Sequence, residues 1–415
     1  VGRGFPSRWV RGRRRSAPGP EPRQLLRRQR DQGPGQPCAG AGAEPAPPGP
    51  RPAAPARDGP QGHRLGRSSR PRALQLWRRR LIEPSTARAD RFRHEALFYS
   101  GRSEFINGTV PFIREGLTAG EPVLVVESLE KIQTLRTALE EDADRVFFAD
   151  MSAVGANPAR IIPAWRDFVT RYGVPGKSLR GIGEPIWSTR TADELVECQR
   201  HESLLNVAFG HGRPWLLLCP YDTAALDSAV IDEARRSHEF VVDGGSSRES
   251  EHFRGIEACG APFSVPLRPT PAGIDELTFE RDGLRHVREL VRKHSIVVGL
   301  DQSKADNLAL AANEVATNSI VHGGGRGTVR VWEDAGRVIC EVRDRGVFDL
   351  PLADRVAPGP DPSSPRGLWL ANQLCDLLQI RTFHGETAVR LHMRLDPRVN
   401  LRVLPGGSNG VDLAH

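Results

Sequence analysis

Short apolar runs alternate with helical segments between residues 96 and 238, and this alternation constrains the fold more than any other feature. The run 122–126 is apolar throughout, as is typical of a strand buried on both faces. Strands of this kind, separated by helices, predict a mostly parallel sheet covered on both sides, an α/β domain that we place at 89–243. The expected strands are 96–99, 122–126, 145–148, 179–186 and 215–219, and the expected helices are 100–116, 129–139, 161–169, 192–209 and 224–238.

A second domain is expected at 264–397, after a Gly- and Ser-rich linker at 244–263. Its apolar spacing predicts an α+β two-layer sandwich with helices on one face of a mixed sheet. The expected helices are 284–291, 303–322 and 368–378, and the expected strands are 328–333, 337–343, 379–383 and 387–395.

The chain carries a formal charge of +7, but the charge is unevenly distributed. Residues 1–90 hold 20 Arg, no Lys and 6 acidic residues, a balance of +14, so the rest of the chain is at −7. Residues 1–88 lack apolar periodicity and are rich in Arg, Pro and Gly, so we expect a disordered leader, with a basic arm for nucleic acid or anionic lipid as the alternative. Residues 398–415 are assigned to a tail. The acidic balance of the predicted domains argues against direct DNA binding by them.

The six cysteines show no CxxC or CxxH spacing, which indicates reduced, buried thiols, no structural zinc and a cytoplasmic location. No run approaches the ~18 apolar residues that cross a bilayer, so we expect no membrane segment. The start of the chain lacks the apolar stretch of a signal peptide.

Glu314 and Asn318 are one turn apart in the predicted helix 303–322, so their side chains share a face. An amide oxygen suits Mg²⁺, and a carboxylate can accept the proton of an attacking hydroxyl group. A solvated helix face often carries the same pair, so this spacing by itself leaves both interpretations open.

Three later segments carry residue types that suit the binding of a base or a phosphate. Asp344 ends a strand and is followed by Gly346, which lets a base come close to the backbone or simply forms a turn. Gly367 opens a helix, where phosphate can reach free amide groups at the positive end of the helix dipole. Thr387 begins a strand, and its hydroxyl is expected to reach Asp344.

In order and spacing, these segments resemble the N, G1 and G2 boxes of the GHKL superfamily. That superfamily includes histidine kinases, type II topoisomerases, Hsp90-type chaperones and anti-sigma kinases. The resemblance covers about residues 266–397 and implies a domain that binds ATP with Mg²⁺.

The resemblance also implies roles for single residues. Asn318 would bind the Mg²⁺ ion, Glu314 would act as general base, and Asp344 would accept a hydrogen bond from the adenine amino group. Gly346 would make room for the adenine, and Gly367 would contact the phosphates beneath a mobile lid.

The second glycine box departs from the usual Gly-x-Gly, because Pro365 precedes Arg366 and Gly367. Proline has no N–H group to offer a phosphate. We expect the charge of Arg366 to compensate.

The ATPase-like segment most resembles the anti-sigma serine kinases of actinobacteria, on the runs 314–325 and 368–376. A histidine kinase would carry a phosphoacceptor hairpin before this domain, and the candidate, His286, lacks the acid-x-x-Thr-Pro pattern. The resemblance implies a serine/threonine kinase that phosphorylates a STAS-fold anti-anti-sigma protein and sequesters a sigma factor. The sequence leaves open whether the chain forms a homodimer.

Two alternatives remain. One is a non-catalytic, ATP-binding partner switch, and the other, less favoured, is a sensor histidine kinase-like protein. Glu314 favours catalysis, because nucleotide binding alone requires no base.

Residues 92–242 resemble the MEDS sensory domain, named for methanogens and methylotrophs, which implies a signal-sensing α/β domain. Residues 100–103 lack the Gly-Lys-Ser/Thr of a phosphate loop, so we expect no nucleotide hydrolysis there. The matching stretches are 93–99, 181–187, 201–206 and 218–222.

Polar residues at the ends of predicted strands should meet at the carboxyl edge of a parallel sheet, where such folds bind small molecules. Turn formation and core packing would explain the same residues. They are Glu184, Cys219, Tyr221 and Asp222.

Three histidines of this domain, His94, His201 and His238, suggest a metal site, but their separation in the sequence favours ordinary polar contacts.

Overall fold

A computed structural model gives the fold of the two predicted domains. The predicted leader and tail lie outside the described residues, except for Val10–Arg11, which form strand β1. The residues that the structure describes are 10–11, 91–210, 212–243, 246–255, 265–348, 350–358 and 366–396.

The first domain is built on an eight-stranded sheet in the order β1-β4-β3-β5-β6-β2-β7-β8. The pairs that join β4 through β7 are all parallel, and the edge strands β1 and β8 are antiparallel to their neighbours. This arrangement confirms the parallel α/β prediction. The strands are β2 (Arg93–Tyr99), β3 (Val123–Glu127), β4 (Phe147–Asp150), β5 (Arg180–Gly183), β6 (Leu216–Asp222), β7 (Phe240–Asp243) and β8 (Ser246–Glu249).

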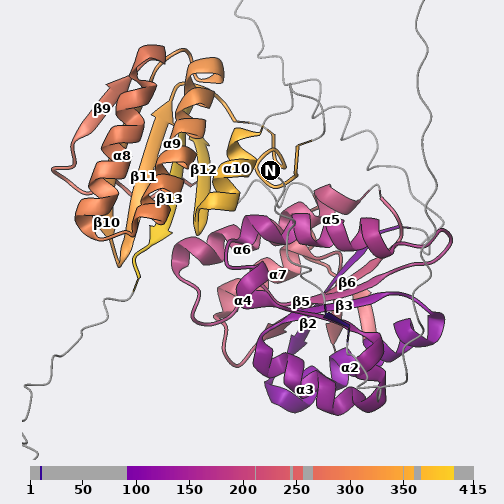
Figure 1. Cartoon of the computed structure of the whole chain (residues 1–415). Helices are drawn as coiled ribbons and strands as arrows, with labels where there is room; N and C mark the ends of the chain where they lie inside the picture. Colours follow the sequence, from indigo (N-terminus) through magenta and orange to yellow (C-terminus); the bar gives the residue numbers. More distant parts are fainter. Residues whose placement is uncertain are drawn as a thin grey trace, which may run out of the picture. The chain divides into compact units, whose positions relative to one another are not determined.

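Helices cover both faces of this sheet (Figure 1). The helix α2 (Gly101–Ala119) and the helix α3 (Leu129–Leu139) lie on one face, and α4 to α7 lie on the other. Two 3-10 turns adjoin these helices: η1 (Glu140–Arg145) follows α3, and η2 (Pro158–Arg160) precedes α5. The remaining helices are α4 (Met151–Val154), α5 (Ile161–Tyr172), α6 (Ala192–Phe209) and α7 (Ser228–Ser237).

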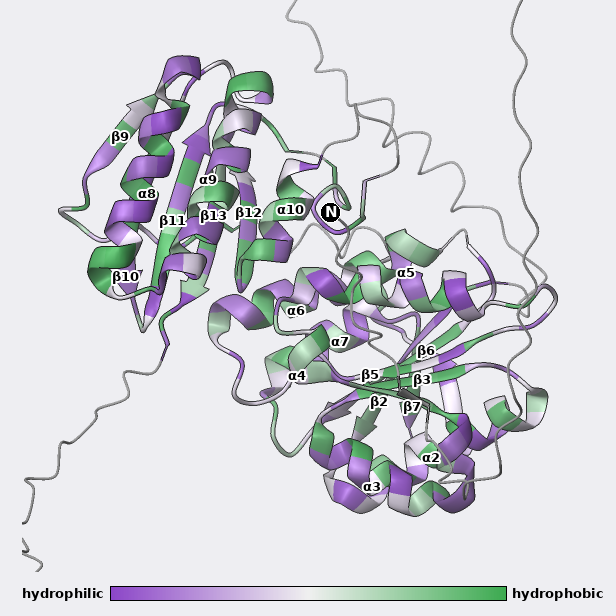
Figure 2. Cartoon of the chain, viewed as in Figure 1, coloured by the Kyte–Doolittle hydropathy of each residue, from purple (hydrophilic) through white to green (hydrophobic). Residues whose placement is uncertain are grey.

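Strand β3 shows why its apolar run is continuous. Val123 and Val125 pack in the core beneath α2 and α3, whereas Leu124 and Val126 pack in the core beneath α5 and α6. Successive side chains of a strand point to opposite faces, so both sets must be apolar when helices cover both sides. Figure 2 shows the hydrophobic strands enclosed by helices of mixed character.

The segment predicted to be a linker contains an ordered strand. Ser246–Glu249 forms β8 and pairs with β7 in antiparallel register. All four of its side chains are exposed, so the pairing uses backbone groups and leaves no apolar pattern in the sequence.

The second domain has a five-stranded sheet in the order β12-β13-β11-β10-β9. Each described pairing is antiparallel, whereas the sequence predicted a mixed sheet. The short edge strand β9 was not anticipated: its four residues alternate between exposed and more buried positions, but so short a run gives only a weak strand signal. The strands are β9 (Glu276–Phe279), β10 (Gly327–Asp334), β11 (Arg337–Asp344), β12 (Leu377–Phe383) and β13 (Glu386–Arg394).

Three helices pack on one face of this sheet and complete the predicted two-layer sandwich (Figure 1). Leu308 and Val315 of α9 lie in one core with Val342 and Leu391 of the sheet. The 3-10 turn η5 (Arg281–Gly283) leads into the first helix. The helices are α8 (Leu284–Val298), α9 (Gln302–His322) and α10 (Gly367–Leu374).

Within the described part of the chain, no helix has both the length and the apolar character needed to cross a bilayer. The four cysteines in this part are free and buried, in line with the expected thiols. They are Cys198, Cys219, Cys340 and Cys375.

Candidate functional site

Helix α9 presents Glu314 and Asn318 on one half-buried face. The helix begins at the cap residue Asp301, whose carboxylate accepts from the backbone N–H groups of Ser303 and Lys304 at 2.9 and 3.1 Å. Such a cap satisfies amide groups that would otherwise lack partners, and so fixes where the helix starts. The two predicted site residues therefore lie one turn apart, as the spacing indicated.

The first residue of α10 lies directly against this face. A Cβ atom on Gly367 would stand 3.1 Å from Oε2 of Glu314 and 3.3 Å from Nδ2 of Asn318. The φ angle of Gly367 is not in the left-handed region. The need for glycine here therefore comes from the close approach of α9 and not from the backbone conformation. The N-terminus of α10 thus meets the carboxylate and the amide of α9.

Asp344, at the end of β11, is held by two donors. Ser319 Oγ donates to its Oδ2 at 2.6 Å, and the backbone N–H of Gly346 donates to its Oδ1 at 2.7 Å. Gly323 follows α9 and packs on the same carboxylate, since a Cβ there would lie 2.4 Å from Cγ of Asp344. A carboxylate has about four acceptor positions, so Asp344 retains capacity for a further donor.

Thr387 lies opposite Asp344 in the register of β11 and β13, but its hydroxyl donates to the backbone oxygen of Gly346 at 2.8 Å. Thr382 Oγ1 lies 2.8 Å from Thr387 Oγ1 and accepts from the backbone N–H of Phe348 at 3.1 Å. Because each hydroxyl has one proton, Thr382 must donate to Thr387. The chain of bonds positions the loop after Asp344 rather than the carboxylate itself.

The structure also shows where Arg366, Asn313 and His286 lie. Arg366 is the exposed cap residue of α10, and Pro365 lies outside the described residues. Asn313 accepts from Arg288 of α8 at 2.8 Å, so its amide oxygen links two helices. His286 is exposed in the first turn of α8.

Sequence reasoning missed three contributors to the arrangement, namely Ser319, Gly323 and Thr382. Ser319 is fully buried among apolar residues of α9, and a buried hydroxyl in that place is the signal that could have found it. The partners of Gly323 and Thr382 are distant in the sequence, so their spacing carries no comparable signal.

In the first domain, a polar group occupies the carboxyl edge of the sheet. Tyr99 donates to Oε1 of Glu184 at 3.0 Å, and Lys131 forms an ion pair with the same carboxylate. Burial, followed by the charge on Glu184, raises the pKa of Glu127 well above its usual value. Burial also raises the pKa of Glu184, against the opposing effect of Lys131. Two adjacent buried carboxyl groups therefore share this edge.

The four strand-end residues do not converge as a single set. Glu184 lies in the edge group, and Asp222 accepts from the backbone N–H of Ala224 at 3.0 Å, as a turn residue does. Cys219 and Tyr221 alternate with their neighbours along β6 and point into the core beneath α6 and α7.

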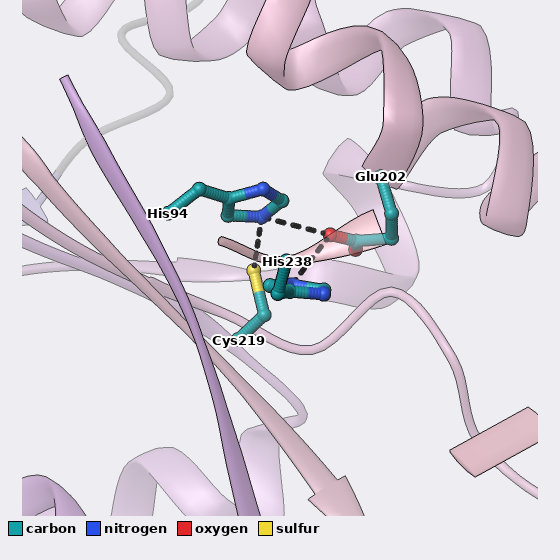
Figure 3. A group of neighbouring side chains, drawn as sticks. All are labelled: His94, Glu202, Cys219 and His238. Atoms are coloured by element: carbon teal, nitrogen blue, oxygen red, sulfur yellow. Dashed lines mark hydrogen bonds and ion pairs between the residues drawn. The ribbon is translucent and has the colours of Figure 1, made fainter. Parts of the chain in front are cut away.

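Of the three histidines, the structure brings two together. The rings of His94 and His238 have centroids 3.9 Å apart, and Nε2 of His94 lies 3.3 Å from Sγ of Cys219. Glu202, which the sequence analysis did not single out, lies between both rings (Figure 3). His201, its neighbour on α6, does not belong to this cluster.

Comparison with protein families divides the chain in the same way as the fold. Residues 93–239 match the family model described as the methanogen/methylotroph, DcmR sensory (MEDS) domain. Residues 277–393 match the histidine kinase-like ATPase domain. The chain therefore contains a MEDS domain followed by a histidine kinase-like ATPase domain, and the second match implies ATP binding.

No match was found among the curated proteins with which the sequence was compared. A solved structure, the RsbU and RsbW domains of Rv1364c from Mycobacterium tuberculosis, shares 24% identity over 31% of this chain, with a TM-score of 0.22. The match spans 33% of that protein's chain, so this chain covers about a third of the relative's length.

Proposed function

We propose that this chain is a signal-responsive anti-sigma regulator whose second domain, residues 264–397, binds Mg–ATP and phosphorylates a serine or threonine of a STAS-fold anti-anti-sigma protein. The first domain, 89–243, would act as the sensor. Phosphorylation would decide whether a sigma factor is sequestered. The proposal rests on the family of the second domain, on the sequence resemblance to anti-sigma kinases and on the geometry around Glu314.

The approach of Gly367 to Glu314 and Asn318 carries the proposal. It places the backbone at a helix N-terminus, without a side chain, next to an amide and a carboxylate. Backbone N–H groups at a helix N-terminus suit phosphate, and amide and carboxylate oxygens suit Mg²⁺. Mg–ATP would supply the phosphoryl group for transfer. The Asn318 amide oxygen would hold Mg²⁺, and the backbone at Gly367 would bind phosphate oxygens.

Glu314 would then act as the base. Its carboxylate would accept the proton of the substrate hydroxyl as that oxygen attacks. Arg366, exposed at the start of α10, would add positive charge near the phosphates. Since Pro365 offers no amide donor, this charge matters more here than in a Gly-x-Gly box.

Asp344 would select adenine. Ser319 and Gly346 hold its carboxylate in place, and the remaining acceptor positions suit the adenine amino group. The fixed loop between Asp344 and Thr387 would form one wall for the base.

The test separates binding from transfer. Calorimetric titration with Mg–ATP should show binding to wild type and to Glu314→Ala, and loss of binding to Asp344→Asn. A STAS-fold protein that co-purifies from the native host should become labelled by γ-labelled ATP with wild type but not with Glu314→Ala.

Nucleotide binding by wild type without labelling of that partner would instead support the non-catalytic switch. Full transfer by Glu314→Ala would refute the base assignment. A sigma factor among the co-purified partners would also support the proposed cytoplasmic location, because sigma factors act in the cytoplasm.

A further inference from the structure

Four buried side chains of the first domain point their ligand atoms at one place (Figure 3). His94 comes from β2, Cys219 from β6, Glu202 from α6, and His238 caps the end of α7. Their ligand atoms all lie within 4.8 Å of one another, and each residue is at most 2% exposed. In the described part of the chain, no other group of His, Cys, Asp and Glu meets this condition.

The contacts outside the cluster decide which ring nitrogens carry protons. Asn206 donates through Nδ2 to the backbone oxygen of Ser237 at 2.7 Å, so its Oδ1 is the atom that faces Nδ1 of His94 at 3.2 Å. Nδ1 of His238 lies 2.8 Å from the backbone oxygen of Ala234. Both Nδ1 atoms must therefore donate, so a ring that carries a single proton directs its Nε2 lone pair into the cluster.

The lone pairs then face a carboxylate. Oε2 of Glu202 lies 3.1 Å from Nε2 of His94 and 3.4 Å from Nε2 of His238. Two imidazole acceptors and a carboxylate converge, and the thiol of Cys219 has one proton to offer. A cation among them would satisfy all four atoms.

The spacing matches a metal shell. Bonds of about 2.0–2.3 Å from zinc to N, O and S ligands give tetrahedral edges of roughly 3.3–3.8 Å. Three of the six separations are close to these edges: His94 Nε2 lies 3.1 Å from Glu202 and 3.3 Å from Cys219, and His238 Nε2 lies 3.4 Å from Glu202. The other three are at most 4.8 Å. Small side-chain shifts suffice to close this shell around an ion.

We propose that His94, Glu202, Cys219 and His238 bind one divalent transition-metal ion, of which zinc fits best. Two imidazoles, a thiolate and a carboxylate form a four-coordinate set suited to zinc, and Nδ1 hydrogen bonds orient both rings as in known metal sites. On binding, the sulfur–metal bond replaces the S–H bond, and the thiol proton passes to solvent. The metal would be part of the sensory domain's core.

The first experiment uses Co²⁺ as a coloured substitute for zinc. The full chain is stripped with a chelator and titrated without nucleotide, so that the ATP site does not take part. We expect one Co²⁺ per chain, visible bands of tetrahedral strength and a near-ultraviolet thiolate-to-cobalt band, all lost when Zn²⁺ is added. A titration without a saturable spectrum, or a spectrum without the thiolate band, would overturn the proposal and leave a shared proton in the cluster.

Two cysteine variants identify the sulfur ligand. Cys219→Ser should lose the thiolate band, whereas Cys198→Ser should keep it, because Cys198 is equally buried but donates to the backbone oxygen of Pro185. The same spectrum from both variants would contradict the assignment. If Cys219→Ser does not fold, the wild-type titration and the next variant still decide.

Asn206→Ala keeps all four ligands and removes the support of His94. The loss of such an outer contact typically weakens metal binding about 10- to 100-fold. An unchanged affinity in this variant would contradict the ring orientation on which the proposal rests. Glu314→Ala should bind Co²⁺ as wild type does, so failure of the proposed kinase would not affect this result.

Discussion

Ser319 Oγ donates a 2.6 Å hydrogen bond to Oδ2 of Asp344, and this contact joins the helix that carries Glu314 to the strand end proposed to bind adenine. The two residues are 25 positions apart and belong to different layers of the domain. One hydroxyl thus aligns the two halves of the proposed nucleotide site.

Ser319→Ala should therefore weaken both stability and nucleotide binding. Hydrogen bonds to charged groups contribute about 1.5–3 kcal/mol to stability. A loss of roughly 1.4 kcal/mol from the free energy of ATP binding lowers the affinity about tenfold. Calorimetric titration with Mg–ATP and the thermal midpoint measure the two effects. Thr317→Ala is the matched control, since Thr317 bonds only to its own helix backbone, at the oxygen of Asn313. Equal effects of the two substitutions would contradict the role of Ser319.

Gly367→Ala should lower ATP affinity while leaving the fold intact. The added methyl group would stand 3.1 Å from Glu314 and crowd the space proposed for phosphate, whereas the backbone conformation suits alanine. Overpacking costs about 1–3 kcal/mol, which corresponds to a loss of roughly 5- to 150-fold in affinity if it opposes ATP binding. Gly212→Ala is the control, because its nearest neighbour would be an ordinary 3.4 Å contact in the first domain. ATP binding at the wild-type level in Gly367→Ala would count against a phosphate site at this helix end.

Thr387→Val should loosen the loop after Asp344. Valine has the shape of threonine but cannot donate to the oxygen of Gly346 or accept from Thr382. The expected cost is about 1–2 kcal/mol of stability, with weaker ATP binding. Thr387→Ser restores the hydroxyl and should recover most of the loss. Denaturant unfolding followed for both variants checks this, and a serine variant as weak as the valine variant would implicate packing instead.

The edge group of the first domain should make stability depend on pH. Burial and the charge on Glu184 raise the pKa of Glu127, so the folded chain binds a proton more tightly than the unfolded chain does. The stability from this group is therefore present at low pH and declines as pH rises above the unfolded value of about 4.3 towards the raised value. Glu127→Gln removes the ionisation and should stabilise the first domain at pH 8 but not at pH 4.

Thermal unfolding at pH 4, 6 and 8 measures this dependence. Glu141→Gln, which changes an exposed glutamate, should leave the profile unchanged. A wild-type profile that Glu127→Gln does not alter would show that Glu127 ionises normally in the fold.

Much of the fold could be predicted because it depends on local periodicity. The apolar run that became β3 and the spacing that places Glu314 and Asn318 on one face of α9 express strand and helix geometry directly. The strands β8 and β9 could not be predicted, since they are short, largely exposed and held by backbone pairing. The direction of pairing in the second sheet is likewise invisible to periodicity, because a strand covered by helices on only one face alternates in the same way whichever direction its neighbours run.

The sequence by itself therefore determined the two fold classes and the positions of the motif residues along their helices and strands. Only the tertiary structure decided which of these side chains meet. The contact of Gly367 with Glu314 depends on how helices pack, and the meeting of His94 with Cys219 depends on the parallel pairing of β2 with β6, 125 residues away. The physical reason is that spacing in a sequence specifies neighbours within one element, whereas contacts between elements depend on the order of strands in the sheet and on the free energy of the assembled core.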